Sequence, residues 1–404
     1  MKALFVTATA QTEANYYLIW HLFKANNTDI THIVILSTEF TCKKDFVKNL
    51  TKVLSLPDFA LDENISIEEL HLPDGIEETS VNAIKAIIMQ WLTTHQPSQV
   101  IFNITGGTKL ISIAQDQIAN TSSRYYCVYQ SRANNQLIWY NNPPNRQRYD
   151  MVIPESITAR LIARGYEQVS AESSLLNLPA EQFYYIDQFD KFITQDLNKA
   201  QSLALLINAL SAEALNNRQE TKFPYVKAIE PNGLYHKCKD WLMVLAQIEQ
   251  PYFSFEPKNN EMLFYSKDAV EFMGGKWFEV WVGYQISRHY FTENNPIKVQ
   301  VGLEFKRNSD GNEADIAYIS NGYFNLMECK TVNWRNKERA TTLVNEKLHK
   351  LASVAQVAGL NSYTYFISLY DIPEQSKKVA QDLGIQLIAD KNLLKLAEFL
   401  KDHN

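Results

Sequence analysis

Two acidic residues and a lysine lie on a segment with the pattern of a β-hairpin. The runs Asp315–Ser320 and Tyr323–Lys330 are rich in apolar and β-prone residues, and Asn321-Gly322 joins them. Asn-Gly is the strongest short hairpin signal, because a type I′ turn needs a positive φ at both positions. A two-residue loop fixes the register, which predicts that Asp315 faces Glu328. Lys330, two residues further along, returns to the same face.

This pairing predicts a cation site. Like charges directly opposite each other destabilise a sheet, and the remainder of this hairpin is largely apolar. A divalent cation between the two carboxylates removes the repulsion, since hard cations take oxygen ligands. The alternative is an edge-strand salt bridge in which Lys330 pairs with Glu328 or Glu313 in solvent.

A second candidate site is the segment Thr105-Gly-Gly-Thr-Lys109, which follows a predicted strand over Gln99–Ile104 and opens a helix. Glycines let backbone N–H groups approach a phosphate, the helix N-terminus adds partial positive charge, and the lysine adds a full one. Neither G-x-x-x-x-G-K-[ST] nor G-x-G-x-x-G is present, which weakens ATPase and NAD chemistry. The alternative is a capped helix start with a flexible turn; the position after a buried strand favours anion binding.

Apolar strands alternating with amphipathic helices predict an α/β fold whose N-terminal part is a doubly wound, mostly parallel sheet. In such folds ligands bind beyond the carboxyl ends of the strands. We expect three parts: a ligand-binding domain over residues 1–145, a partly helical connector over 146–270, and a second domain over 271–404. A small winged-helix-like unit is one possibility for the connector.

Composition bounds the class of protein. The chain has 404 residues, of which 46% are hydrophobic and 21% charged, as in an ordinary globular protein. No apolar run approaches the 18–20 residues or so of a membrane span, so no membrane partner is expected. Four scattered cysteines without a C-x-x-C pair predict reduced thiols in the cytoplasm and argue against a structural zinc site. The net charge of −6 has the wrong sign for a protein coated in nucleic acid, so any such contact is local.

The spacing of Asp315, twelve residues, and then Glu-X-Lys resembles the active site of the PD-(D/E)XK nuclease superfamily. The resemblance implies that Asp315, Glu328 and the backbone carbonyl of Cys329 hold Mn²⁺ or Mg²⁺, while Lys330 positions the attacking water. Two further segments resemble family motifs, and they add catalytic candidates: Glu279, in Gly274-Gly275-Lys-Trp-Phe278-Glu279, and Lys350, in Leu348-His-Lys-Leu351.

A Rossmann-like domain with a T-G-G-T-K loop, placed ahead of a PD-(D/E)XK domain, resembles the CRISPR-associated Rossmann fold (CARF) effector nucleases of type III CRISPR defence. The resemblance implies a homodimer that cuts DNA and/or RNA when a cyclic oligoadenylate binds. We expect cyclic tetra-adenylate, with cyclic hexa-adenylate as the alternative. The implied ligand-binding residues are Gln11, Asn15, Thr105, Gly106, Gly107, Thr108 and Lys109.

One more segment suits nucleic acid. Trp334 lies among Arg335, Lys337 and Arg339, where phosphates could be held by the charges and a base stacked on the ring; a solvated loop is the alternative.

Two other functions are compatible with these residues. One is a non-catalytic CARF sensor that regulates transcription, which leaves the facing carboxylates unexplained. The other is a DNA repair or restriction nuclease that needs no ligand.

Overall fold

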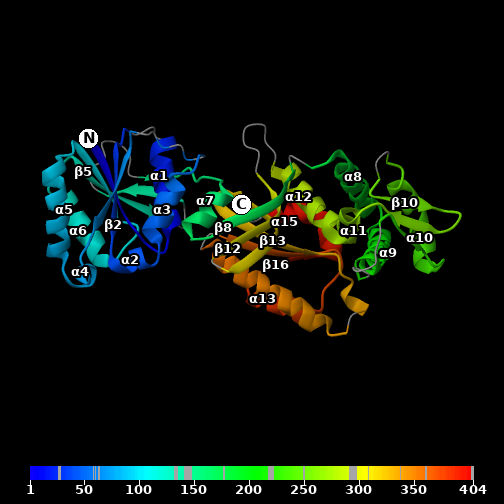
Figure 1. Cartoon of the computed structure of the whole chain (residues 1–404). Helices are drawn as coiled ribbons and strands as arrows, with labels where there is room; N and C mark the ends of the chain where they lie inside the picture. Colours follow the sequence, from blue (N-terminus) through cyan, green and yellow to red (C-terminus); the bar gives the residue numbers. More distant parts are fainter. Residues whose placement is uncertain are drawn as a thin grey trace. The chain divides into compact units, whose positions relative to one another are not determined.

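The structure, a computed structural model, forms two compact units, which are described separately (Figure 1). Unit 1 comprises residues 1–168 and 306–310, and unit 2 comprises residues 169–305 and 311–404. The residues described are 1–25, 29–57, 59, 61, 64–131, 135–140, 148–175, 178–216, 223–248, 251–290, 298–307, 309–336, 338–359 and 362–401. The boundary expected after residue 145 lies outside these residues, and the division at residue 270 stays a prediction.

The centre of unit 1 is a sheet with strand order β3-β2-β1-β4-β5-β6-β7 in the part of the chain described. Strands β1 to β5 pair in parallel, and β6 and β7 continue the sheet in antiparallel fashion. This confirms the predicted doubly wound α/β class. The strands are β1 (Lys2–Thr7), β2 (His32–Ser37), β3 (Ser66–His71), β4 (Gln99–Asn103), β5 (Tyr125–Ser131), β6 (Gln136–Trp139) and β7 (Arg148–Asp150).

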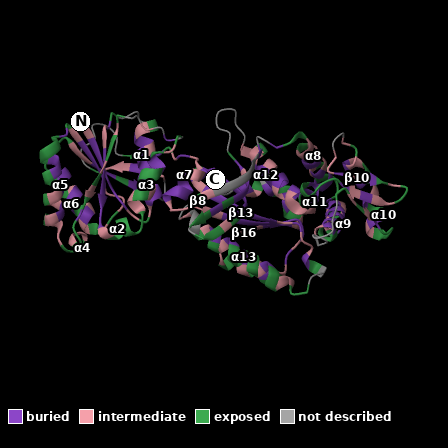
Figure 2. Cartoon of the chain, in the orientation of Figure 1, coloured by how far each residue is buried: buried purple, intermediate pink, exposed green. Residues whose placement is uncertain are grey.

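Helices cover both faces of this sheet, because successive strand residues point to opposite sides. Leu4 and Val6 of β1 pack in one apolar cluster with α1 and α3, whereas Ala3 and Phe5 pack in another with α5 and α6. Figure 2 shows the resulting buried strands between partly exposed helices. The helices are α1 (Thr12–Trp20), a π-helix (His21–Ala25), α2 (Glu39–Lys43), α3 (Phe46–Leu54), α4 (Ile76–Thr79), α5 (Val81–His95), α6 (Lys109–Ala119) and α7 (Ile157–Ala163).

Unit 2 is built on a sheet with order β16-β15-β14-β13-β12-β8 and a smaller sheet with order β10-β11-β9, within the residues described. The strands are β8 (Glu167–Ser174), β9 (Tyr225–Ala228), β10 (Phe253–Glu256), β11 (Glu261–Phe264), β12 (Gln300–Arg307), β13 (Asp310–Ser320), β14 (Tyr323–Lys330), β15 (Ser362–Ser368) and β16 (Gln386–Ala389).

The helices of unit 2 join the predicted connector and the predicted nuclease domain in one core. For example, Phe189 of α8 stacks on Trp277 of α12 with ring centroids 3.7 Å apart. The helices are α8 (Ala180–Gln195), α9 (Leu197–Asn216), α10 (Gly233–Leu245), α11 (Lys267–Glu271), a π-helix (Phe272–Lys276), α12 (Trp277–Tyr290), a 3₁₀ turn (Trp334–Asn336), α13 (Ala340–Ala358), α14 (Glu374–Asp382), a 3₁₀ helix (Asp390–Lys395) and α15 (Leu396–Lys401).

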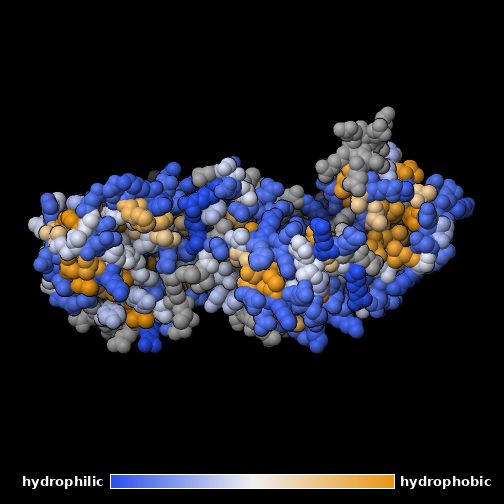
Figure 3. All heavy atoms as spheres, turned by 90° about the horizontal axis from the view of Figure 1, so that it is seen from below, coloured by the Kyte–Doolittle hydropathy of each residue, from blue (hydrophilic) through white to orange (hydrophobic). Residues whose placement is uncertain are grey.

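The face of the molecule in Figure 3 is mainly hydrophilic, with apolar patches interrupted by polar side chains. None of the helices among the described residues combines the length and hydropathy needed to cross a bilayer.

Candidate functional sites

The β13–β14 hairpin forms as the sequence predicts. Ile319 pairs with Phe324, and Ile316 with Met327, in the register that a two-residue loop dictates. Asn321 has φ of 49° and Gly322 has φ of 79°, so both turn residues have the positive φ that a type I′ turn needs. The prediction of this turn and register is therefore confirmed.

The two carboxylates of the hairpin point to the same side of the sheet and are each only 7% exposed (Asp315 and Glu328). The Lys330 ammonium lies between them, with Nζ 2.9 Å from Asp315 Oδ2 and 2.7 Å from Glu328 Oε1. The same ammonium donates to the backbone carbonyl of Cys329 at 2.9 Å. The three oxygens expected to hold a metal thus converge on one cationic atom. The pair is buried, which departs from the alternative of a solvated edge salt bridge.

The charges of this cluster shift one another's pKa. Burial raises the pKa of Glu328, and the Asp315 charge adds to the rise, which Lys330 and Lys347 oppose. Burial works against the charged form of Lys330, but the two carboxylates and their hydrogen bonds outweigh it and raise its pKa. The cluster consequently holds an ammonium that stays charged beside a Glu328 carboxyl group whose ionisation is disfavoured by burial.

A third carboxylate, Glu279 on α12, belongs to the same electrostatic cluster. Burial and then the Asp315 charge raise its pKa from an ordinary 4.5 to about 8. The π-helix before α12 carries Gly275 at φ of 151°, and a Cβ there would lie 3.2 Å from Thr331 Oγ1. A Cβ on Gly274 would lie 3.1 Å from Ser211 Cβ. Gly275 therefore lets the start of α12 lie close to the end of β14, and Gly274 lets it lie close to α9.

Metal-free protein should lose stability as pH rises from about 4.5 to about 8, in part through Glu279. The folded pKa of Glu279 is above its unfolded value, so the folded state holds the extra proton in this window and raising the pH removes that advantage. One such group contributes at most about 1.4 kcal/mol per pH unit. Glu279→Gln should flatten this part of the curve of unfolding free energy against pH, measured with urea in a chelator.

The matched control is Glu346→Gln, which removes an exposed carboxylate from α13 of the same unit. It should keep the pH slope of the native chain. Parallel curves for the native chain and Glu279→Gln would contradict the assignment.

Two further candidates for the nuclease site differ in their burial. Lys350 is exposed on α13, and it is Lys347, one turn earlier, whose charge acts on Glu328. Trp334 is only 5% exposed and packs in an apolar cluster with Val344 and Leu348, with its Nε1 donating to Ser368 Oγ. The proposed base stacking on this ring is therefore wrong, because the ring is part of the core. Lys337 lies outside the described residues.

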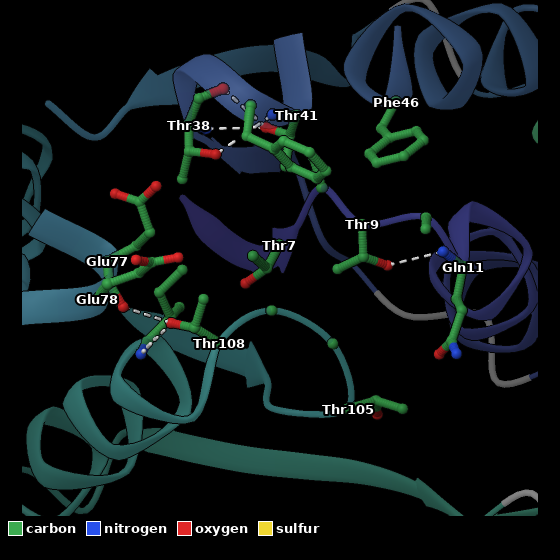
Figure 4. A pocket seen from close by; sticks show the side chains of 16 residues that line it. Thr7, Thr9, Gln11, Thr38, Thr41, Phe46, Glu77, Glu78, Thr105 and Thr108 are labelled. Carbon is green, nitrogen blue, oxygen red and sulfur yellow. Dashed lines mark hydrogen bonds between the residues drawn. The ribbon is translucent and has the colours of Figure 1, made fainter. Parts of the chain in front are cut away.

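Unit 1 contains a cavity of about 490 Å³ beyond the carboxyl ends of β1, β2 and β4 (Figure 4). Threonines from several loops line this cavity, and they are smaller and more polar than the apolar residues of the strands. The lining includes Thr7 at the end of β1, Thr9 and Gln11 after β1, Thr38 and Thr41 at α2, Glu77 and Glu78 of α4, and Thr105 to Thr108 before α6. This is the edge at which a doubly wound sheet binds ligands.

The glycine loop lies tightly against the first strand. A Cβ on Gly106 would be 2.9 Å from Thr9 Cγ2, and one on Gly107 would be 2.7 Å from Thr7 Cγ2. Gly107 also has φ of 90°, a backbone conformation that side chains disfavour. Thr108 caps α6 by accepting from the Ile111 N–H at 3.4 Å, and its hydroxyl donates to the Glu77 carbonyl at 2.7 Å. The loop thereby fixes the N-terminus of α6 at the cavity.

Two predicted ligand residues do not line this cavity. Asn15 is buried, and its side chain donates to the Thr7 carbonyl at 2.7 Å and accepts from Asn103 at 2.8 Å. Asn103 in turn accepts from the Thr105 N–H at 3.0 Å, so Asn15 positions the two loops from beneath. Lys109 is exposed and lies outside the lining.

Two polar atoms at the cavity are buried without a hydrogen-bond partner: the hydroxyl of Thr7 and Oε2 of Glu77. A buried polar atom without a hydrogen-bond partner destabilises the fold unless a ligand or a water molecule forms the missing hydrogen bond. Glu77 and Glu78 were missed by the sequence analysis, because α4 is one turn long and carries no amphipathic period.

These features define a class of protein: a Rossmann-like domain with a threonine-lined cavity, joined to a hairpin with the acidic and basic residues of a PD-(D/E)XK nuclease. Comparison with known proteins agrees. Residues 6–159 match the family model of the Card1 CARF domain, and residues 266–404 match that of the Card1-like endonuclease domain. The chain belongs to the CARF-domain effector nucleases.

Solved structures share the fold over the whole chain. Can2 from Sulfobacillus thermosulfidooxidans, in complex with cyclic tetra-adenylate, is 17% identical with a TM-score of 0.72, and the match covers 100% of both chains. Protein VC1899 from Vibrio cholerae is 19% identical with a TM-score of 0.78, covering 99% of this chain and 97% of that one. A search of curated protein sequences gave no match.

Proposed function

We propose that this protein is a cyclic-oligoadenylate-activated, metal-dependent nuclease of type III CRISPR defence, acting in the cytoplasm as a homodimer. The observation that carries the catalytic part is the convergence of Asp315 Oδ2, Glu328 Oε1 and the Cys329 carbonyl on one ammonium, at 2.7 to 2.9 Å. Three hard oxygens that already surround one positive charge form a donor set suited to Mg²⁺ or Mn²⁺.

In this proposal these three oxygens would hold a divalent cation, which would supply a water of lowered pKa and neutralise charge on the phosphate. The chain's own groups do the rest. Lys330 leaves the oxygens that it holds in the metal-free state and turns its ammonium to the phosphate, where it stabilises the charge that develops. Glu279 completes the acidic shell. The reaction is hydrolysis of a phosphodiester bond in DNA and/or RNA.

The receptor half of the proposal rests on the cavity of unit 1. Its glycine loop and the N-terminus of α6 offer N–H groups to phosphate, and the structural relative Can2 binds cyclic tetra-adenylate. A ring of four identical nucleotides is symmetric, so two copies of the cavity related by a two-fold axis could present the same groups to both halves. We therefore place the activator across a homodimer, with cyclic hexa-adenylate as the alternative ring size.

The test is cleavage of labelled DNA and RNA by the full chain with Mn²⁺ or Mg²⁺, with and without cyclic tetra-adenylate or cyclic hexa-adenylate. We expect cutting only when both metal and activator are present. Cutting without any activator would overturn the receptor half and favour a ligand-independent nuclease. Sequence-specific DNA binding without hydrolysis under any condition would overturn the catalytic half and favour a sensor.

Glu77 should read the nucleoside part of the activator. Its Oε2 is buried and unpartnered at the cavity, and a carboxylate repels phosphate but accepts from an adenine amino group or a ribose hydroxyl. A hydrogen bond to a charged group contributes about 1.5–3 kcal/mol, so Glu77→Ala should weaken cyclic tetra-adenylate binding by about 10- to 100-fold. Calorimetry on the full chain measures this.

Glu78→Ala is the control, because it removes the same charge from the adjacent, more exposed position. It should leave the affinity unchanged or improve it slightly by reducing repulsion of the phosphates. If both variants bind the activator more tightly, Glu77 acts only as a repulsive charge.

A further inference from the structure

A second cluster of metal-ligand side chains lies on unit 1, at the edge strand β3. One ligand atom each from Cys42, Glu69 and His71 lie within 4.8 Å of one another. The Cys42 thiol donates to Glu69 Oε1 at 3.2 Å. Glu69 and His71 are two residues apart on β3 and therefore share a face, and Cys42 comes from α2. None of the three belongs to the cavity lining or to the nuclease cluster.

Ser37, at the end of β2, orients two of these groups. Its hydroxyl donates to Glu69 Oε1 at 2.5 Å and lies 3.1 Å from His71 Nδ1. Because the single hydroxyl proton goes to Glu69, His71 Nδ1 must carry the proton of the second hydrogen bond. The neutral imidazole then has its lone pair on Nε2, as a metal ligand requires. A hydrogen bond that fixes the tautomer in this way is typical of metal-ligating histidines.

Acidic side chains surround this cluster. Asp74 lies close enough to Glu39 to share a hydrogen bond, which raises the pKa of Asp74 and lowers that of Glu39, and the His71 charge acts on both. Lys43 forms an ion pair with Glu39. Three acidic side chains (Glu39, Glu69 and Asp74) therefore lie near one lysine and the His71 imidazole, which favours a cation.

We propose that Cys42, Glu69 and His71 bind a divalent cation of the zinc class. Thiol, imidazole and carboxylate are together the ligands of Zn²⁺, whereas Mg²⁺ avoids sulfur. The Cys42 proton passes to solvent as the sulfur–metal bond forms, since the thiolate is the ligand. Three protein ligands leave a fourth position for water.

This site has a consequence for the cavity. Cys42 is the last residue but one of α2, and Thr38, Phe40 and Thr41 just before it belong to the cavity wall. A capping box between Thr38 and Thr41 makes this segment rigid at its start. A cation that joins Cys42 to β3 would fix its other end, so it should change the affinity of the cavity for its ligand. This second step rests on the proposed function, whereas cation binding itself does not.

Cobalt(II) is a suitable probe for the full chain, because a cobalt–thiolate bond gives a charge-transfer absorption that oxygen ligands do not. We expect this absorption in the native protein and in Glu328→Gln, which alters only the nuclease cluster. Cys42→Ser should abolish this absorption. His71→Ala should lower the affinity for Zn²⁺, measured by displacement of cobalt(II), by more than about tenfold. Cys42 is exposed, so serine there should not disturb folding.

An absorption that persists in Cys42→Ser, or its absence from the native protein, would overturn the site. The effect on the cavity is tested separately: Zn²⁺ should shift cyclic tetra-adenylate affinity in the native chain and not in Cys42→Ser. An equal affinity with and without Zn²⁺ in the native chain would overturn the coupling alone. Failure of the nuclease assay leaves the cobalt result interpretable, because that readout needs no activity.

Discussion

Lys330→Ala is expected to abolish activator-dependent cleavage while strengthening the binding of Mn²⁺ to the nuclease cluster. The ammonium occupies the point on which Asp315, Glu328 and the Cys329 carbonyl converge, so in the metal-free state it stands where the cation is proposed to bind. Removing it takes away a competitor for these oxygens. It also removes a charge-stabilising group, which typically costs about 10²–10³-fold in rate.

The same substitution should lower the stability of the metal-free protein. Breaking a buried ion pair leaves uncompensated charge and typically costs about 3–5 kcal/mol, reduced here because the two carboxyl groups can take up protons. Added Mn²⁺ should restore the loss, and it should stabilise Lys330→Ala more than the native chain. Urea unfolding with and without Mn²⁺ measures both effects, and calorimetry measures metal affinity.

Glu328→Gln gives the complementary result. This substitution replaces a carboxylate that is proposed to bind the metal by an uncharged amide of the same shape, so metal affinity and cleavage rate should both fall. Loss of a residue that only hydrogen-bonds a metal ligand already costs about 10–100-fold in metal affinity or activity, and loss of a ligand should cost at least about 100-fold. Binding of cyclic tetra-adenylate should be unchanged in both variants, because the residues belong to unit 2 and the cavity to unit 1.

Lys350→Ala is the matched control for these lysine and charge effects. This substitution removes an exposed ammonium from α13, and the variant should cut nucleic acid at nearly the native rate. A loss equal to that of Lys330→Ala would restore Lys350 as a catalytic candidate. Cleavage that survives in both Lys330→Ala and Glu328→Gln would place the active site elsewhere.

The hairpin could be predicted from sequence because its information is local. Asn321-Gly322 specifies the turn, and the turn specifies the register, which is observed as far as Ile316–Met327 and brings Asp315 and Glu328 to the next position. The burial of the pair depends on helices distant in sequence, and so does the approach of Glu279, which the π-helix and its glycines permit. Motif spacing identified these residues, but only the packing shows that one ammonium neutralises them.

Strand β3 lies outside the elements that the hydropathy pattern predicts. It is an edge strand whose residues are exposed or half-buried, including Glu68 and Glu69, so it carries no apolar run. For the same reason the Cys42–Glu69–His71 cluster was not found. The absence of C-x-x-C pairs argues against the common structural zinc sites, but ligands from three separate positions in the chain leave no such spacing.

Asn15 and Trp334 show a different limit. Sequence identified both as residues of the right chemistry near a site, and an amide or an indole can serve a ligand or the core equally well. In the structure Asn15 joins the β1 and β4 loops by buried hydrogen bonds, and Trp334 fills an apolar cluster. Only tertiary contacts distinguish these roles.

Gly107→Ala is expected to abolish the response to cyclic oligoadenylate while leaving the metal-dependent cluster intact. The new Cβ would lie 2.7 Å from Thr7 Cγ2, and the φ of 90° disfavours any side chain, so the loop must shift. The loop carries the N-terminus of α6, and a displacement of about 1 Å in a binding site can cost about 10²-fold. Calorimetry with cyclic tetra-adenylate and activated cleavage should fall together, whereas Mn²⁺ affinity should not.

Two further variants separate the clash from the backbone strain. Gly384→Ala has a comparable φ of 68° with no atom within 4 Å of the new Cβ, so it should lose about 1–2 kcal/mol of stability and keep its activator response. Thr7→Ser removes the methyl group that Gly107→Ala would meet, and the double variant should recover part of the affinity because the nearest contact becomes Thr7 Cβ at 3.2 Å. If Gly107→Ala alone binds the activator as the native chain does, the glycine loop is not where the phosphates are held, and the cavity would have to bind its ligand through α2 and α4.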